Sequence, residues 1–245
     1  IPVIILFEGW GAAGKGGIIS DLILNFDPRG FKVYSTAEPT EEEKRHPPMW
    51  RHWKNLPEKG LMAILDRSWY QDVSIARVED DLSDAENLRR MNNINTFERQ
   101  LTDNGYLVLK FFLHISQKEQ KARFDKLEDD KNTAWRVTEK DRWRNKHYNL
   151  YYRTLDEMLE YTNTPNAPWH VVCSNDSQAA LLSVYRTVVD AVHEAIEAKK
   201  QGLSISSAKG IPAPKPFNTV HTPLLSEITL EDKTITEEKY KKELS

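Results

Sequence analysis

The chain has 245 residues, of which 39% are hydrophobic and 29% charged. This composition is typical of one large globular domain, or of a domain plus a tail, and it excludes a chain that is disordered throughout. The formal net charge is −3, from 34 basic and 37 acidic residues. Binding of a polyanion therefore requires a local basic cluster, and we expect no nucleic-acid partner.

The first seven residues, IPVIILF, are apolar but have no basic flank. We therefore expect neither a signal peptide nor a membrane-spanning segment. No methionine precedes this strand-like run, which suggests a fragment of a longer protein. The single cysteine, Cys173, excludes an internal disulfide and favours the cytoplasm. It lies in the apolar run WHVVC, where we expect it to be buried.

Strand-like and helix-like segments alternate along the first 200 residues. Short β-rich runs predict strands at Pro2–Glu8, Phe31–Ser35, Leu61–Leu65, Leu107–His114 and His170–Cys173. Helical patterns lie between them at Lys15–Asn25, Met49–Lys54, Asp84–Asp103, Lys118–Glu128, Thr138–Tyr161 and Ser177–Lys200. Apolar strands separated by helices predict a three-layer α/β fold, with a mainly parallel five-stranded sheet covered by helices on both faces.

The pattern changes at residue 201. Four of the twelve prolines lie in residues 201–245, which end with the helix-like EEKYKKEL. We expect residues 1–200 to form one domain and residues 201–245 to be a tail or linker that begins another helix near its end.

A glycine-rich segment follows the first predicted strand and opens the first predicted helix. Residues 9–15 have the pattern G-x-x-x-x-G-K. Glycines in such a turn let backbone N–H groups point at a phosphate, and the helix N-terminus adds its positive dipole. The motif in this context predicts a phosphate-binding loop that uses Gly9, Gly14, Lys15, Gly16 and Gly17. A glycine-rich turn without a ligand is the alternative.

Gly16 stands where such loops usually have a Ser or Thr that binds Mg²⁺. A metal must then be held by carboxylates, water and the phosphates. Asp66, at the end of the third predicted strand, is the candidate metal ligand, because ligands of open α/β sheets bind beyond the carboxyl ends of strands. Arg67 beside it is a candidate phosphate contact. The simpler alternatives are a helix N-cap for Asp66 and a surface ion pair for Arg67.

Basic residues crowd the segment after the fourth predicted strand. A basic helical excursion of this kind, roughly residues 118–150, is typical of a lid over bound phosphates. Arg123, Lys131 and Arg136 are its candidate phosphate contacts. Acidic residues are interleaved with them, so a solvated helix pair with salt bridges is the alternative.

Several stretches, in order over roughly residues 1–200, resemble the polyphosphate kinase 2 family. They are FEGWGAAGKGG, EPTEEEKRHPPMWRHW, LPEKG, DRSWY, FERQLTDNGYLVLKFFLHIS, KEQKARF and NTPNAPWHVV. The resemblance implies a P-loop kinase-like fold with a helical lid. It also implies Mg²⁺-dependent phosphate transfer between inorganic polyphosphate and a nucleoside mono- or diphosphate, AMP or ADP. Lys15, Asp66 and Arg67 would then be the phosphate lysine, the metal carboxylate and the phosphate arginine.

Two features depart from the family pattern. Gly11 stands where the family typically has an Asp that organises the metal and the reacting phosphates. In the lid, Thr133 and Ala134 replace a basic pair, which leaves Lys131 and Arg136 as substitutes. Both changes remove functional groups while the scaffold residues are retained.

The stretch PLLSEITLEDKTITEEKYKKEL resembles the segment that joins two tandem copies in longer family members, which look like polyphosphate:AMP phosphotransferases. We therefore expect the chain to be the first copy of such a pair, with weak activity. The alternatives are a catalytically degenerate copy with a structural or regulatory role and, less favoured, an ordinary ATP-dependent small-molecule kinase. The expected partners are polyphosphate, a nucleotide, an intramolecular second domain and, from the exposed helices, a second copy in a homo-oligomer.

Overall fold

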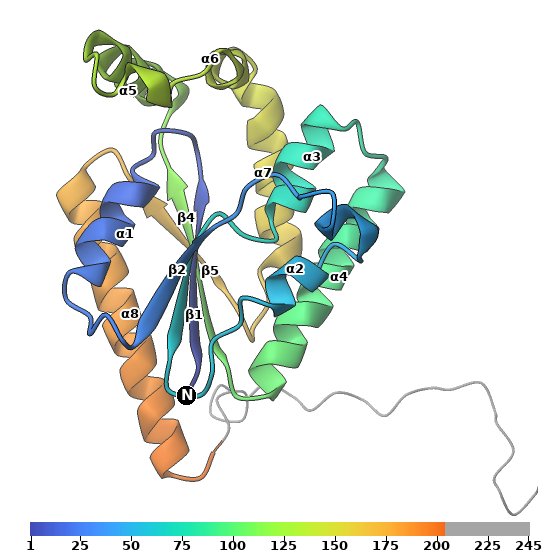
Figure 1. Cartoon of the computed structure of the whole chain (residues 1–245), viewed down its shortest axis with the longest axis vertical. Helices are drawn as coiled ribbons and strands as arrows, with labels where there is room; N and C mark the ends of the chain where they lie inside the picture. Colours follow the sequence, from blue (N-terminus) through green and yellow to red (C-terminus); the bar gives the residue numbers. More distant parts are fainter. Residues whose placement is uncertain (204–245) are drawn as a thin grey trace, which may run out of the picture. The chain divides into compact units, whose positions relative to one another are not determined.

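The computed structural model describes residues 1–203. The predicted tail falls outside this part of the chain from residue 204 onward. Within it, five strands form one sheet (Figure 1). They are β1 (Val3–Gly9), β2 (Phe31–Ser35), β3 (Met62–Asp66), β4 (Leu107–His114) and β5 (Trp169–Cys173).

The sheet has the strand order β2-β3-β1-β4-β5, and every neighbouring pair is parallel. β1 lies at the centre, in agreement with its apolar run, and its side chains are buried from Val3 to Glu8. The chain turns to one side of β1 to form β2 and β3, and to the other side to form β4 and β5. The carboxyl end of β1 is therefore where strand order reverses, the position at which such sheets bind ligands.

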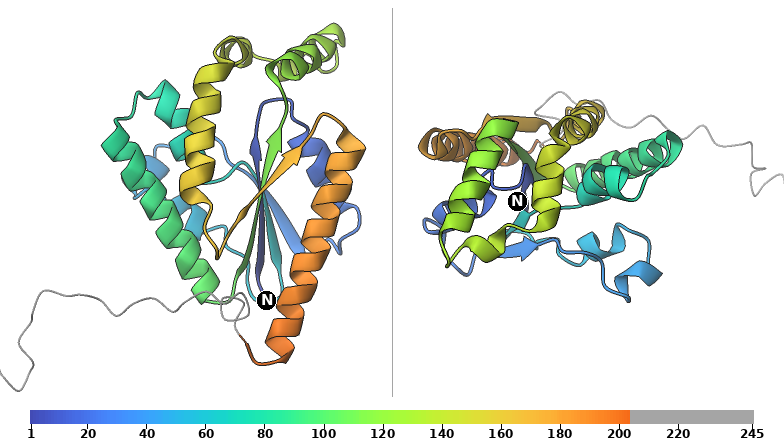
Figure 2. Two further views of the ribbon diagram at one scale, coloured as in Figure 1. Left: turned by 180° about the vertical axis from the view of Figure 1, so that it is seen from behind. Right: turned by 90° about the horizontal axis from the view of Figure 1, so that it is seen from above.

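Helices cover both faces of this sheet. The helices are α1 (Lys15–Ile23), α2 (Trp50–Trp53), α3 (Gln71–Glu79), α4 (Asp84–Asp103), α5 (Gln117–Asp129), α6 (Glu139–Lys146), α7 (Tyr148–Thr162) and α8 (Ser177–Lys200). α1 and α8 pack together on one face, whereas α3, α4 and α7 pack on the other (Figures 1 and 2). The predicted three-layer α/β fold with a parallel five-stranded sheet is confirmed.

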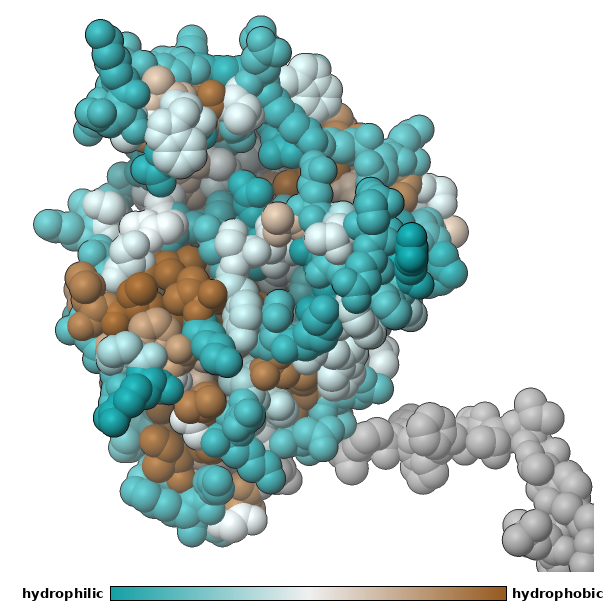
Figure 3. Space-filling view, viewed as in Figure 1, coloured by the Kyte–Doolittle hydropathy of each residue, from teal (hydrophilic) through white to brown (hydrophobic). Residues whose placement is uncertain are grey.

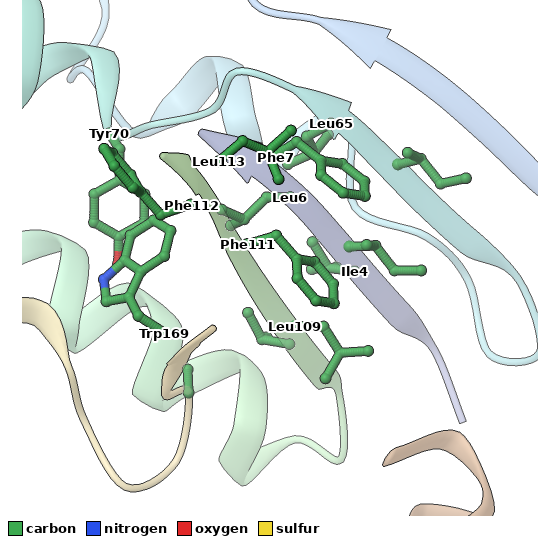
Figure 4. Close-up of a cluster of buried hydrophobic side chains, with 14 of the residues drawn as sticks. Ile4, Leu6, Phe7, Leu65, Tyr70, Leu109, Phe111, Phe112, Leu113 and Trp169 are labelled. Carbon is green, nitrogen blue, oxygen red and sulfur yellow. The ribbon is translucent and has the colours of Figure 1, made fainter. Parts of the chain in front are cut away.

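The core lies between these layers. Its central part consists of fully buried side chains of β1 and β4, including Phe7 and Phe111, whose rings stack 5.3 Å apart (Figure 4). Trp169 of β5 packs near Tyr70 at one edge of this cluster. Dense packing of this kind holds the strand ends in fixed positions. None of the described helices is both long and apolar enough to span a membrane.

α5 and α6 project beyond the carboxyl ends of the strands, where they lie above the turn that follows β1 (Figure 1). The expected helix Thr138–Tyr161 is wrong in one respect, because it is two helices that meet at His147. Thr138 and Asp141 cap the start of α6 with reciprocal hydrogen bonds. The break at His147 lets α6 lie over the strand ends while α7 runs down the face of the sheet.

The expected burial of Cys173 is also wrong, because its side chain is exposed. β5 is an edge strand, and its side chains alternate between the core and the outside. Val171 and Cys173 lie on the outer side, while Val172 is buried.

Candidate active site

The turn between β1 and α1 requires two of its glycines for steric reasons. Gly9 has φ +125°, and a Cβ there would lie 2.3 Å from the carbonyl oxygen of Leu113 on β4. Gly14 has φ +99° and precedes the first residue of α1. Gly16 and Gly17 lie in the first helical turn, and a Cβ on either one would have no neighbour within 4 Å. Their backbone is therefore open to a ligand.

Lys15 folds back over this turn. Its Nζ donates hydrogen bonds to the carbonyl oxygens of Gly9, at 3.0 Å, and Trp10, at 2.9 Å. Burial and the nearby Arg67 lower the pKa of Lys15 to about 8, although Glu8, Asp66 and Asp141 act in the opposite direction. Lys15 thus lies among the charged groups of the site, with its ammonium held by two backbone oxygens of the turn.

β3 brings the second pair of predicted residues beside the turn. Phe7 of β1 pairs with Asp66, and the backbone N–H of Arg67 donates to the Phe7 oxygen at 3.0 Å. Arg67 has φ +64°, a left-handed conformation that costs about 1–3 kcal/mol for a residue with a side chain and is concentrated at functional sites. Among the described residues Arg67 forms no ion pair, and α3 starts at Gln71 without a side-chain cap. The simpler alternatives, a helix N-cap for Asp66 and a surface ion pair for Arg67, therefore do not describe this loop.

Asp66 has a feature that favours cation binding. Its Oδ1 is buried and accepts no hydrogen bond from the described residues. A buried carboxylate oxygen without a partner is costly, so it is suited to a ligand. In residues 1–203 no group of three or more His, Cys, Asp or Glu is placed to hold a metal. A Mg²⁺ ion at Asp66 would complete its shell with water and phosphate oxygens, as this ion usually does.

Glu8 is a site residue that the sequence reasoning missed. Its Oε1 accepts from the Ser68 N–H at 2.8 Å and the Ser68 hydroxyl at 2.9 Å, and its Oε2 accepts from Gln71 at 2.9 Å. Burial raises the pKa of Glu8 to about 7, against the opposing effect of the Ser68 hydrogen bonds and of Lys15. Glu8 thereby ties the loop after β3 to the end of β1. The available signal was a carboxylate that ends an otherwise apolar strand.

The predicted lid contacts the turn through α5. Arg123 donates to the carbonyl oxygens of Ala12 at 3.1 Å, Ser174 at 2.6 Å and Asn175 at 3.1 Å. Its Nε–H donates to Glu119 of the same helix at 2.7 Å. In this arrangement Arg123 holds the base of the lid to the turn and to the loop after β5.

Above the turn lies a cavity of about 890 Å³, and Figure 3 shows the surface hollowed beneath the lid. Lys15, Asp66, Arg67, Arg123 and Arg136 are among the residues that line it, together with the predicted loop glycines Gly14, Gly16 and Gly17. The third predicted lid residue, Lys131, is not among its lining residues. The lining combines five cationic side chains with three carboxylates, a composition suited to a phosphate chain with its counter-ion.

A second cavity of about 520 Å³ lies on the other side of Arg67. Its walls include Arg51 and Arg90, as well as Lys140 and Arg144 of α6. Arg67 lines both cavities, so the two cavities adjoin at this residue.

The comparisons with known proteins agree over most of the described residues. Residues 1–200 match the family described as polyphosphate kinase 2. The polyphosphate:AMP phosphotransferase of Pseudomonas aeruginosa is 38% identical over 199 residues, which are 81% of this chain and 40% of that protein. The ADP-polyphosphate phosphotransferase of Rhodopseudomonas palustris is 30% identical over 200 residues, covering 77% of this chain and 69% of that protein.

Solved structures show the same relationship. The crystal structure of polyphosphate kinase 2 from Arthrobacter aurescens superposes with a TM-score of 0.75 at 36% identity, covering 78% of this chain and 68% of that one. A polyphosphate kinase 2 from Pseudomonas aeruginosa gives a TM-score of 0.77 at 37% identity, covering 80% and 42%. The chain spans about 40% of the length of the polyphosphate:AMP phosphotransferases that it matches. Because the family match covers residues 1–200, the chain belongs to the polyphosphate kinase 2 family.

Proposed function

We propose that the chain is a phosphotransferase domain that moves phosphate between inorganic polyphosphate and a nucleoside mono- or diphosphate, AMP or ADP, with Mg²⁺. One observation carries the proposal: the family match spans residues 1–200, and within it Lys15, Asp66 and Arg67 line one cavity. Two relatives are named for AMP and for ADP. We expect the domain to work in the cytoplasm, in line with its single cysteine.

In this proposal the polyphosphate terminus lies on the backbone N–H groups at the start of α1. Lys15 leaves its two carbonyl partners to bind a phosphate oxygen, and Arg67 binds the phosphate from the side of β3. The acceptor nucleotide occupies the neighbouring cavity, beside the lid residues Lys140 and Arg144. Catalysis then consists mainly of positioning and charge neutralisation.

Asp66 is the residue that would hold Mg²⁺, through the oxygen that lacks a protein partner. When bound, Mg²⁺ neutralises the charge of the phosphates. α5 and α6 lie over the loop, where Gln120 donates to the Gly11 oxygen at 3.1 Å. We expect this cover to limit the access of water to bound phosphates and so to slow their hydrolysis.

The second candidate function is a catalytically degenerate copy that binds ligands within a longer tandem protein. Gly11 favours it, because this turn has no carboxylate of its own at that position. A Cβ on Gly11 would lie 3.4 Å from the ring of Phe124 on α5, so the neighbouring space is partly taken by the lid. The chain matches 40% of the length of its polyphosphate:AMP phosphotransferase relative, and in this candidate function residues 201–245 would lead to a second copy.

Turnover decides between the two functions. The chain is incubated with Mg²⁺, polyphosphate and AMP or ADP, and the nucleotides are separated by chromatography. We expect product from the unmodified chain and a loss of at least about 100-fold in Lys15→Met, since a phosphate-binding cation supplies several kcal/mol. Product from Gly11→Asp alone would establish the degenerate copy instead. Absence of turnover in both, together with absence of polyphosphate binding, would contradict both functions.

A further inference from the structure

The lid carries a carboxylate that reaches the phosphate-binding turn. Asp141 lies in the first turn of α6, and its Oδ2 accepts from the N–H of Thr138 at 3.0 Å and from its hydroxyl at 2.6 Å. Its other oxygen, Oδ1, accepts no hydrogen bond from the described residues. Helix capping therefore uses one oxygen of this carboxylate and leaves the second for another partner.

The free oxygen of Asp141 lies beside the turn, next to Gly11. A Cβ on Gly11 would lie 3.7 Å from this oxygen and 3.6 Å from the amide nitrogen of Gln120. Both contacts come from the lid. Residue 11 has no carboxylate of its own, and a carboxylate from a different part of the chain lies within van der Waals distance of its Cβ position.

Asp66 and Asp141 line the same cavity, together with Lys15. One stands at the end of a central strand and the other on the lid, so they belong to different walls of the cavity. Each is near enough to Lys15 to favour its charged form. Oδ1 of each carboxylate accepts no hydrogen bond from the described residues, and Oδ1 of Asp66 is buried.

Two free carboxylate oxygens beside a phosphate-binding loop match the way in which proteins hold Mg²⁺, with one or two carboxylates and the substrate's own phosphates. We propose that Asp141 is the second carboxylate of a cation–phosphate site whose first carboxylate is Asp66. The inference rests on the proposed function for the identity of the ligand, a divalent cation with polyphosphate. It assigns to the lid a metal ligand as well as a covering role.

The experiment measures cation binding rather than turnover. Mn²⁺ is titrated into the full chain in the presence of saturating tripolyphosphate, and the free ion is followed by electron paramagnetic resonance. We expect Asp141→Asn to weaken Mn²⁺ binding by about tenfold or more, the range typical for damage to a metal site. Asp66→Asn should weaken it at least as much.

Thr138→Ala is the matched control, because it removes the hydroxyl that donates to Asp141 and keeps both the carboxylate and the hydrogen bond from the backbone N–H of residue 138. We expect its Mn²⁺ affinity to stay within about twofold of that of the unmodified chain, as the helix cap contributes only about 1 kcal/mol to stability. A second measurement, of tripolyphosphate binding without any metal, tests whether the substitution raises or lowers the affinity for the anion. Asp141→Asn should leave it unchanged or strengthen it, because a negative charge is removed, whereas a purely structural defect would weaken it.

The possible outcomes distinguish the assignment of Asp141 as a metal ligand from the proposed function of the chain. Unchanged Mn²⁺ affinity in Asp141→Asn, with a loss in Asp66→Asn, overturns the assignment of Asp141 and leaves the proposed function intact. An equal loss in Thr138→Ala reduces Asp141 to a capping residue. If Asp141→Asn lowers the melting temperature more than Thr138→Ala does, Asp141→Glu decides: retained affinity supports the assignment, and lost affinity contradicts it. Failure of the unmodified chain to bind tripolyphosphate overturns both proposals.

Discussion

The ammonium of Lys110 and the carboxylate of Glu98 form a fully buried ion pair, with Nζ 2.8 Å from Oε2. Lys110 also donates to the Tyr70 hydroxyl and to the Thr162 carbonyl oxygen, each at 2.8 Å. The other oxygen of Glu98 accepts from the Trp69 indole at 3.0 Å and from Tyr70 at 2.7 Å. Both aromatic residues belong to the loop after β3, so this buried pair anchors the loop that carries Arg67 and directly follows the candidate metal ligand Asp66.

Removing one partner of this pair should be costly. We expect Lys110→Met to lower the free energy of unfolding by about 3–5 kcal/mol, because it leaves the carboxylate of Glu98 buried and unpaired. Urea denaturation measures the loss. The double variant Lys110→Met/Glu98→Gln should recover part of it, and a single-variant loss below about 1 kcal/mol would contradict this account.

Phosphate binding should depend on the protonation of Lys15. Its pKa is lowered to about 8, mainly by burial, so the ammonium is present below that pH and is lost above it. We expect tripolyphosphate affinity to fall by up to about tenfold per pH unit above pH 8, a slope of one proton. Calorimetry at several pH values between about pH 7 and pH 9.5 measures this loss of affinity. Lys15→Arg keeps its positive charge over this range, so its affinity for tripolyphosphate should not decline. An identical decline in Lys15→Arg would show that a group other than Lys15 causes it.

Glu8 should make the unfolding free energy fall as pH rises. Its pKa is raised from 4.5 to about 7 in the folded chain, so the folded state holds the proton more tightly than the unfolded state. The stabilisation is complete below pH 4.5 and is lost as pH rises through 7. Glu8→Gln should therefore gain stability relative to the unmodified chain across this window, by at most about 1.4 kcal/mol per pH unit.

Unfolding curves at several pH values test this prediction. The exposed Glu58 supplies the control, because Glu58→Gln removes a surface carboxylate and keeps the hydrogen bonds that Ser68 and Gln71 donate to Glu8. A difference between Glu8→Gln and the unmodified chain that does not vary with pH would show that Glu8 does not titrate between these limits.

Arg123 should hold α5 against the turn. We expect Arg123→Met to speed amide hydrogen exchange in Gln117–Asp129 by at least about tenfold, since each charge-assisted hydrogen bond contributes about 1.5–3 kcal/mol. Lys121→Met, an exposed substitution on the same helix, should leave exchange unchanged. Equal exchange in the two variants would mean that α5 is held by its other contacts.

Much of the fold could be predicted because its signals are local. The strand at Leu107–His114 and the helices Asp84–Asp103 and Ser177–Lys200 have the predicted bounds. In each, a long apolar or amphipathic pattern coincides with local propensity. The division of the predicted helix Thr138–Tyr161 was missed, because helical residues continue on both sides of His147. α3 was missed as well, since only two of its residues, Val73 and Ser74, are buried.

The candidate site was predictable only in part. Lys15, Asp66 and Arg67 could be named because a motif or a strand end marks each of them, and their roles stay predictions until the binding experiments are done. Glu8 and Asp141 carry no comparable mark. Their positions depend on which strands and helices end beside the turn, which a local pattern does not encode.

The sequence by itself determined the family, the parallel α/β architecture and the phosphate-binding turn, because glycine spacing and apolar periodicity act over a few residues. Only the tertiary structure decided what fills the space beside Gly11. There the lid's Phe124, Gln120 and Asp141 lie against the turn, more than 100 residues away along the chain. Their placement depends on the packing of α5 and α6 over the ends of the strands.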